Sequence, residues 1–119
     1  MKIITLNTWA GVVFEPLLIF LSSHKDVDIF CLQEVYSNAE GKEQGHLKLD
    51  FKLNLFEQIQ DIFKDTHNGY FRPSHLDYYG QAIFVRKDIP VEKEGDIFVY
   101  ENTSPEGRGR HSRNLQYVQ

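Results

Sequence analysis

The chain has 119 residues, the size of one modest domain. Its apolar fraction of 41% and charged fraction of 25% are ordinary for a globular protein, so intrinsic disorder is not expected. The formal net charge of -4 disfavours a general nucleic-acid-binding surface, because such surfaces are usually basic.

Cysteine content and hydropathy bear on the cellular compartment and on membrane segments. Cys31 is the single cysteine, which excludes an intramolecular disulfide and favours a reducing compartment, so we expect a cytoplasmic protein. The longest apolar stretch, residues 12–21, is interrupted by Glu15 and Pro16 and falls short of the roughly 20 residues that a membrane span needs. The N-terminal apolar run is too short for a signal-peptide core. We therefore expect no transmembrane segment.

The first third of the chain predicts a strand, a helix and a second strand. Residues 2–6 are rich in β-forming side chains and end at Asn7, and both faces of this strand are apolar or neutral, as in a strand covered on both sides. Pro16 suits the first turn of a helix. Residues 27–35 form a nearly continuous apolar run that ends in Gln33 and Glu34. This order predicts a right-handed crossover and parallel pairing of the two strands.

The remainder predicts one more helix and several strands. Asn54 is a candidate cap for a helix over residues 55–64, whose apolar side chains recur at helical spacing and should face the core. These core residues are Phe56, Ile59, Ile62 and Phe63. Beyond it we expect a turn at 67–69, a strand from 70 that Pro73 ends, strands at 80–86, 95–100 and 114–118, and a loop at 102–112. The fold class predicted is mixed α/β.

Asn7 and Glu34 each lie at the C-terminal end of a predicted buried strand. Parallel neighbours bring these ends to one rim of the sheet, where ligands bind in open α/β folds. An amide and a carboxylate suit Mg²⁺, which often takes one or two carboxylates together with substrate phosphate. From spacing alone, the alternative is that Glu34 is only a solvated strand end and Asn7 only a turn residue.

Four segments, in order along nearly the whole chain, resemble motifs of the endonuclease/exonuclease/phosphatase family. The run Ile4-Thr5-Leu6-Asn7-Thr8-Trp9 resembles its opening strand, and Asp28-Ile29-Phe30-Cys31-Leu32-Gln33-Glu34-Val35 resembles its second motif. Tyr79-Gly80-Gln81-Ala82-Ile83-Phe84-Val85 is similar to its Gly-x-Ala-Ile strand. Arg113-Asn114-Leu115-Gln116-Tyr117-Val118 looks like the strand before its central catalytic portion.

The resemblance implies a Mg²⁺-dependent phosphodiesterase or phosphatase, with Mn²⁺ as a possible substitute. It implies that Glu34 is a direct metal ligand, that Asn7 orients the metal–phosphate complex as a second member of the metal site, and that Gln33 braces the strand end. The implied substrate is a phosphoester, either nucleic acid or a phospholipid-type head group. The implied fold is a four-layer sandwich of two sheets with helices outside.

Residues 1–119 depart from the family's pattern in what they lack. The family completes its site with a Gly-Asp-x-Asn motif and an Asp-His pair, whereas here Gly95-Asp96 is followed by Ile97-Phe98 and no Asp-His sequence occurs. We therefore expect a truncated, N-terminal half of such a domain, with little or no turnover alone. A complementing C-terminal half or self-association would cover its exposed strand edges.

A basic segment near the C-terminus is a further candidate. Arg110, His111 and Arg113 could contact substrate phosphate through charge-assisted hydrogen bonds, or form a solubilising loop. Each of the other histidines is expected to be a surface residue. Two alternatives stay open for the whole chain: a non-catalytic binding or assembly module built on the same half-fold, and an unrelated small α/β protein.

Overall fold

The computed structural model describes residues 1–42, 49–103 and 112–119. Its elements in chain order are β1 (Ile3–Asn7), the short 3₁₀ helix η1 (Trp9–Gly11), α1 (Phe14–Ser23), β2 (Ile29–Tyr36), α2 (Leu55–Phe63), β3 (His67–His75), β4 (Tyr79–Arg86), β5 (Glu94–Tyr100) and β6 (Arg113–Val118).

Four strands form the central sheet in the order β1-β2-β4-β3. β1 and β2 are parallel, with Ile3 opposite Ile29 and Asn7 opposite Gln33, as the strand–helix–strand pattern predicts. The β2–β4 and β3–β4 pairs are antiparallel. β5 and β6 pair with each other in a separate antiparallel sheet.

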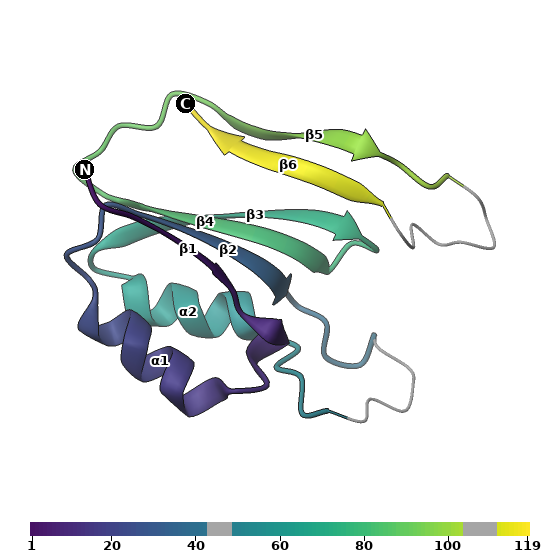
Figure 1. Ribbon diagram of the computed structural model, residues 1–119, viewed down its shortest axis with the longest axis horizontal. Coiled ribbons are helices and arrows are strands. Elements are labelled where there is room, and N and C mark those ends of the chain that lie inside the picture. The colour runs from purple at the N-terminus through teal and green to yellow at the C-terminus, as the bar shows by residue number, and fades with distance from the viewer. Residues whose placement is uncertain (43–48, 104–111) are drawn as a thin grey trace.

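Three layers are stacked in space (Figure 1). Helices α1 and α2 cover one face of the four-stranded sheet, and the β5–β6 hairpin lies over its opposite face. The predicted mixed α/β class is therefore confirmed, with a mixed sheet and two flanking helices. Within the described ranges, neither helix has the length and apolar character that crossing a membrane requires.

The apolar core lies between the helices and the sheet. Its fully buried aromatic side chains are Phe30, Phe63 and Phe84, and the Phe30 and Phe63 rings stack with centroids 4.9 Å apart. Burying a side chain of this size stabilises the fold by about 1.5–3 kcal/mol. From α2, Phe56, Ile59 and Phe63 are buried as predicted, and Ile62 packs on the same core half-buried.

Polar side chains join the two sheets. Arg72 of β3 donates from Nε to Glu94 of β5 at 2.9 Å and makes a second bond to the same carboxylate through its terminal nitrogen. Gln116 of β6 donates to the Tyr70 carbonyl oxygen at 2.9 Å. Such bonds are directional, so they fix where the hairpin sits over the central sheet.

Both helices begin close to where the sequence places them. Pro16 lies in the first turn of α1, where its missing N–H leaves no bond unmade. Asn54 stands at the N-cap position of α2 as predicted, but its side chain makes no capping hydrogen bond.

Two local predictions in β3 are wrong. Residues 67–69 begin a strand instead of forming a turn, because the His67 ring is buried and its Nε2 bonds the Val27 carbonyl oxygen at 2.8 Å. His67 is therefore not a surface histidine. Pro73 does not end the strand, which continues to His75, because β3 is an edge strand where proline is tolerated.

The expectation that the first strand is covered on both faces is also wrong. Along β1, Ile3, Thr5 and Asn7 are exposed, whereas Ile4 and Leu6 pack on the core. β1 is the edge strand of the central sheet. The β5–β6 hairpin packs mainly against β3 and β4, so the face of β1 on that side stays open. One exposed face leaves Asn7 accessible at the rim.

Candidate functional site

A pocket of about 290 Å³ opens at the sheet rim where β1 and β2 end. In Figure 1 this is the rim that also receives the start of β4 and the start of β6. The pocket contains the predicted site residues Asn7, Glu34 and Arg113 together. Its full lining is Asn7, Gln33, Glu34, Ser74, Tyr79, Gly80, Gln81 and Arg113.

A β-bulge turns Glu34 toward this pocket. Between the pairs Leu32–Ala82 and Val35–Gly80, β2 has two residues where β4 has one. Leu32 and Val35 consequently both reach the helix-side core, and Glu34 has a φ of 57°, in the left-handed region. Without the bulge, strict alternation would place Glu34 on the same face as Leu32. Left-handed backbone costs a non-glycine residue about 1–2 kcal/mol, and such strain concentrates at functional sites.

Thr8 holds the strained backbone in place. Its amide donates to the Gln33 carbonyl oxygen at 3.0 Å, and its buried hydroxyl lies 2.9 Å and 2.8 Å from the carbonyl oxygens of Gln33 and Glu34. Gln33 braces the same strand end, because its amide nitrogen lies 3.0 Å from both the Thr5 hydroxyl and the Cys31 carbonyl oxygen. The ends of β1 and β2 are thus tied by side chains as well as by strand pairing.

Asn7 is fixed by a turn of its own. Its side-chain oxygen accepts a hydrogen bond from the Trp9 amide at 2.8 Å, which is an Asx turn. A carbonyl oxygen has a second lone pair, and the amide group also has two N–H donors. Asn7 can therefore contact a cation or an anion in the pocket while keeping its turn.

Arg113 reaches the pocket from the second sheet. It is exposed, and one of its guanidinium nitrogens donates to the Ser112 carbonyl oxygen at 2.8 Å. The start of β6 is anchored on β4, since the Gln81 side chain donates to the Asn114 side-chain oxygen at 2.9 Å. Arg110 and His111, the other candidate phosphate contacts, lie outside the described residues.

Tyr79 is a pocket residue to which sequence reasoning assigned no role. Burial raises the pKa of its hydroxyl from 10.0 to about 12, with the Glu34 carboxylate adding to the rise and the Arg113 guanidinium opposing it. The charges of Glu34 and Arg113 therefore both lie close enough to influence the Tyr79 hydroxyl. The sequence gives no signal for this role, because Tyr79 comes near Glu34 only through the antiparallel pairing of β4 with β2.

The pocket offers one carboxylate, the amide side chains of Asn7, Gln33 and Gln81, and hydroxyls from Ser74 and Tyr79. The charges of Glu34 and Arg113 balance, so an added divalent cation would leave the site positive and attractive to a phosphate. Over the described stretches of chain, no three or more His, Cys, Asp or Glu side chains are grouped to hold a metal ion.

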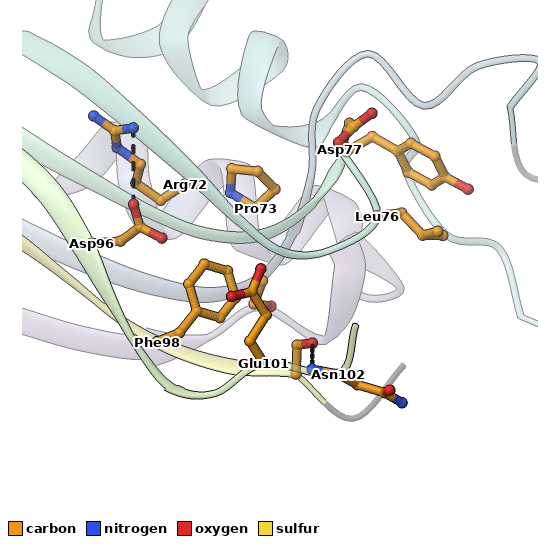
Figure 2. A pocket seen from close by; sticks show the side chains of 11 residues that line it. Arg72, Pro73, Leu76, Asp77, Asp96, Phe98, Glu101 and Asn102 are labelled. Carbon is orange, nitrogen blue, oxygen red and sulfur yellow. Dashed lines mark hydrogen bonds and ion pairs between the residues drawn. The ribbon is translucent and has the colours of Figure 1, made fainter. Parts of the chain in front are cut away.

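A larger pocket of about 630 Å³ adjoins this one, and Ser74 lines both. Figure 2 shows Leu76 and Asp77 entering it from the β3–β4 turn, with Phe98 and Glu101 approaching from the end of β5. Arg72 lies at one side, with a guanidinium nitrogen 3.9 Å from an Asp96 oxygen. Three carboxylates against one paired arginine make its lining acidic.

A third, apolar groove of about 330 Å³ lies on the outer side of Asn7, between the end of β1 and α1. Trp9, Val13 and Phe20 form part of it, and the Trp9 and Val13 side chains are each about half exposed. Asn7 therefore stands between a polar and an apolar pocket.

Comparison of the chain with protein-family models, with curated proteins and with solved structures gave no match in any of the three.

Proposed function

We propose that the Asn7–Glu34–Arg113 pocket binds a divalent cation together with a phosphate group, as part of a Mg²⁺-dependent phosphoesterase site. The observation that supports this most strongly is the bulge at Glu34, which turns a carboxylate out of the core into a pocket that also contains an amide and a guanidinium. The substrate class is a phosphoester of the nucleic-acid or phospholipid-type kind.

The residues present fit a hard divalent ion. Mg²⁺ takes oxygen ligands and retains several waters, so one carboxylate and one amide oxygen are a sufficient protein share of its shell when substrate phosphate supplies another oxygen. A water takes about 30 Å³ of liquid volume, so 290 Å³ accommodates a hydrated ion beside one phosphate group. Mn²⁺ has the same ligand preference and would bind in its place.

Each side chain has a distinct task in this proposal. Glu34 would hold the ion, and Asn7 would give it one amide oxygen and so orient the metal–phosphate complex. The Arg113 guanidinium neutralises phosphate charge through paired N–H donors. When bound, the ion would supply Lewis-acid stabilisation of charge on the phosphoryl oxygens.

Binding and turnover are separate expectations. Hydrolysis also needs a base that deprotonates the attacking water, and a carboxylate that holds the metal is not available for that task. Residues 1–119 by themselves are therefore expected to bind the metal and phosphate but to hydrolyse phosphoesters slowly or not at all.

Two assays on matched variants test the proposal. Mg²⁺ is titrated into ¹⁵N-labelled protein, and hydrolysis of bis(p-nitrophenyl) phosphate is followed in parallel. Glu34→Gln keeps the side-chain shape and should abolish saturable Mg²⁺ shifts at the rim, whereas Glu92→Gln, at an exposed carboxylate outside the pocket, should leave them unchanged. Equal Mg²⁺ affinity in the wild type, Glu34→Gln and Glu92→Gln would contradict the proposal.

The second candidate function is a non-catalytic assembly module, and one observation favours it. The outer face of the β5–β6 hairpin presents Ile97, Val99 and Leu115, which are 61%, 78% and 54% exposed. Ile97 and Leu115 lie directly opposite each other and form an apolar strip on this two-stranded sheet, whose outer edges pair with no other described strand.

Sedimentation of the wild-type protein and Ile97→Lys separates this candidate from the first. A module that self-associates through the strip would become monomeric on this substitution, and Glu34→Ala would leave its association intact. Loss of association in Glu34→Ala would contradict the module.

A further inference from the structure

The side chain of Tyr79 lines the Asn7–Glu34–Arg113 pocket, and its hydroxyl has no hydrogen-bond partner among the described residues. Tyr79 is half-buried and lines the pocket beside Glu34 and Arg113. Among residues 1–42, 49–103 and 112–119, no group hydrogen-bonds the Tyr79 hydroxyl, whereas Gln33, Asn7 and Gln81 all use their side chains in structural bonds. A polar group that is held at a pocket without a partner is available to a ligand.

The ring of Tyr79 is held firmly by its neighbours. It contacts the Tyr36 ring, with centroids 4.7 Å apart, and lies edge-on to His75 at 6.4 Å. The next residue is Gly80, where a Cβ would come within 2.1 Å of the Arg72 carbonyl oxygen, so β3 and β4 approach closely at this point. The hydroxyl is thus placed by packing before any ligand arrives.

We propose that the Tyr79 hydroxyl donates a hydrogen bond to an oxygen of the phosphate bound in the pocket, on the side away from the metal. This assignment deepens the proposed function and rests on it. A phosphate has more acceptor oxygens than the metal and Arg113 can occupy, and a tyrosine hydroxyl is protonated at neutral pH and provides one directional donor. Tyr79 would be a phosphate-binding residue, with no share in holding the metal.

The geometry allows one competing role, in which the hydroxyl braces the Glu34 carboxylate and so serves the metal. The two roles differ in what the removal of the hydroxyl weakens. Loss of a phosphate donor lowers phosphate affinity alone. Loss of a brace on the metal ligand lowers Mg²⁺ affinity in the absence of phosphate.

Tyr79→Phe tests the proposal, because phenylalanine keeps the ring and its packing. Tyr70→Phe, at a β3 tyrosine outside the pocket, is the matched control. Mg²⁺ alone, and then phenyl phosphate at saturating Mg²⁺, are titrated into each ¹⁵N-labelled protein, and the amide signals of Glu34 and Gly80 are followed. Dispersed spectra establish first that both variants are folded.

We expect Tyr79→Phe to bind phenyl phosphate about tenfold more weakly than the wild type, with unchanged affinity for Mg²⁺ alone. Unchanged phenyl phosphate affinity in Tyr79→Phe would overturn the role of Tyr79 and leave the proposed function standing. A matching loss of Mg²⁺ affinity would overturn it in favour of the brace. Failure of the wild type to bind phenyl phosphate with Mg²⁺ would overturn the proposed function itself.

Discussion

Because Glu34 has a left-handed backbone, we expect glycine to be favoured over alanine at this position, the reverse of their usual order in a strand. At a regular strand position, glycine is less stable than alanine by about 0.5–1 kcal/mol, because glycine loses more backbone entropy on folding. At φ = 57° the alanine variant retains the left-handed penalty of about 1–2 kcal/mol, and the glycine variant does not.

The test uses two pairs of variants at adjacent positions of β2. Glu34→Gly and Glu34→Ala both remove the carboxylate, and Gln33→Gly and Gln33→Ala both remove the bracing amide, so side-chain losses cancel within each pair. We expect the difference in unfolding free energy between glycine and alanine to change by about 1–2 kcal/mol in favour of glycine on going from position 33 to position 34.

Urea denaturation followed by circular dichroism measures all four unfolding free energies, with equal denaturant slopes as the check that the two-state comparison holds. Both Glu34 variants should also lose Mg²⁺ binding, so the glycine variant would combine relieved backbone strain with a lost site. Equal glycine-minus-alanine differences at the two positions would refute the view that the bulge stores strain at Glu34.

Three further predictions concern the parts that support the site. Thr8→Val removes the hydroxyl that lies 2.8 Å from the Glu34 carbonyl oxygen, so it should lower stability by about 1 kcal/mol and weaken Mg²⁺ binding. Thr8→Ser keeps the hydroxyl and should preserve both quantities, which calorimetry measures. A normal Mg²⁺ affinity in Thr8→Val would show that the Thr8 hydroxyl does not hold Glu34 in position. Burial lowers the pKa of His67 below its usual 6.5, so just below pH 6.5 the unfolded chain binds more protons than the folded one. Stability should therefore fall as pH drops from 6.5 toward the lower folded-state pKa, and His67→Gln should remove this pH dependence of the melting temperature. An unaltered dependence in His67→Gln would contradict the assignment of this pH dependence to His67. Gly80→Ala places a Cβ within 2.1 Å of the Arg72 carbonyl oxygen, so it should destabilise the protein by about 2–3 kcal/mol in thermal unfolding, and a loss below about 0.5 kcal/mol would show that β3 and β4 separate easily there.

The elements that could be predicted are those whose pattern follows local rules. The parallel β1–β2 pair follows from an apolar strand, a helix and a second apolar strand, and α2 follows from the spacing of its buried side chains. The convergence of Asn7 and Glu34 follows from the same rule, because parallel neighbours end at one rim.

What escaped prediction depends on tertiary contacts. The sequence Leu32-Gln33-Glu34-Val35 carries no sign of a bulge, because the extra residue is set by pairing with β4 and by Thr8. His67 looks like a turn residue by local propensity, yet its ring is drawn into the core by Phe30 and Phe63. Tyr79 could not be assigned without knowing that β4 begins where β2 ends.

Anomalous diffraction from crystals soaked with Mn²⁺ and phenyl phosphate tests the central claim most directly. The account predicts an anomalous peak about 2.1 Å from a Glu34 carboxylate oxygen, with phosphate density between that peak and the Arg113 guanidinium. Saturating Mn²⁺ with no peak in the Asn7–Glu34–Arg113 pocket, or with peaks elsewhere only, would contradict it.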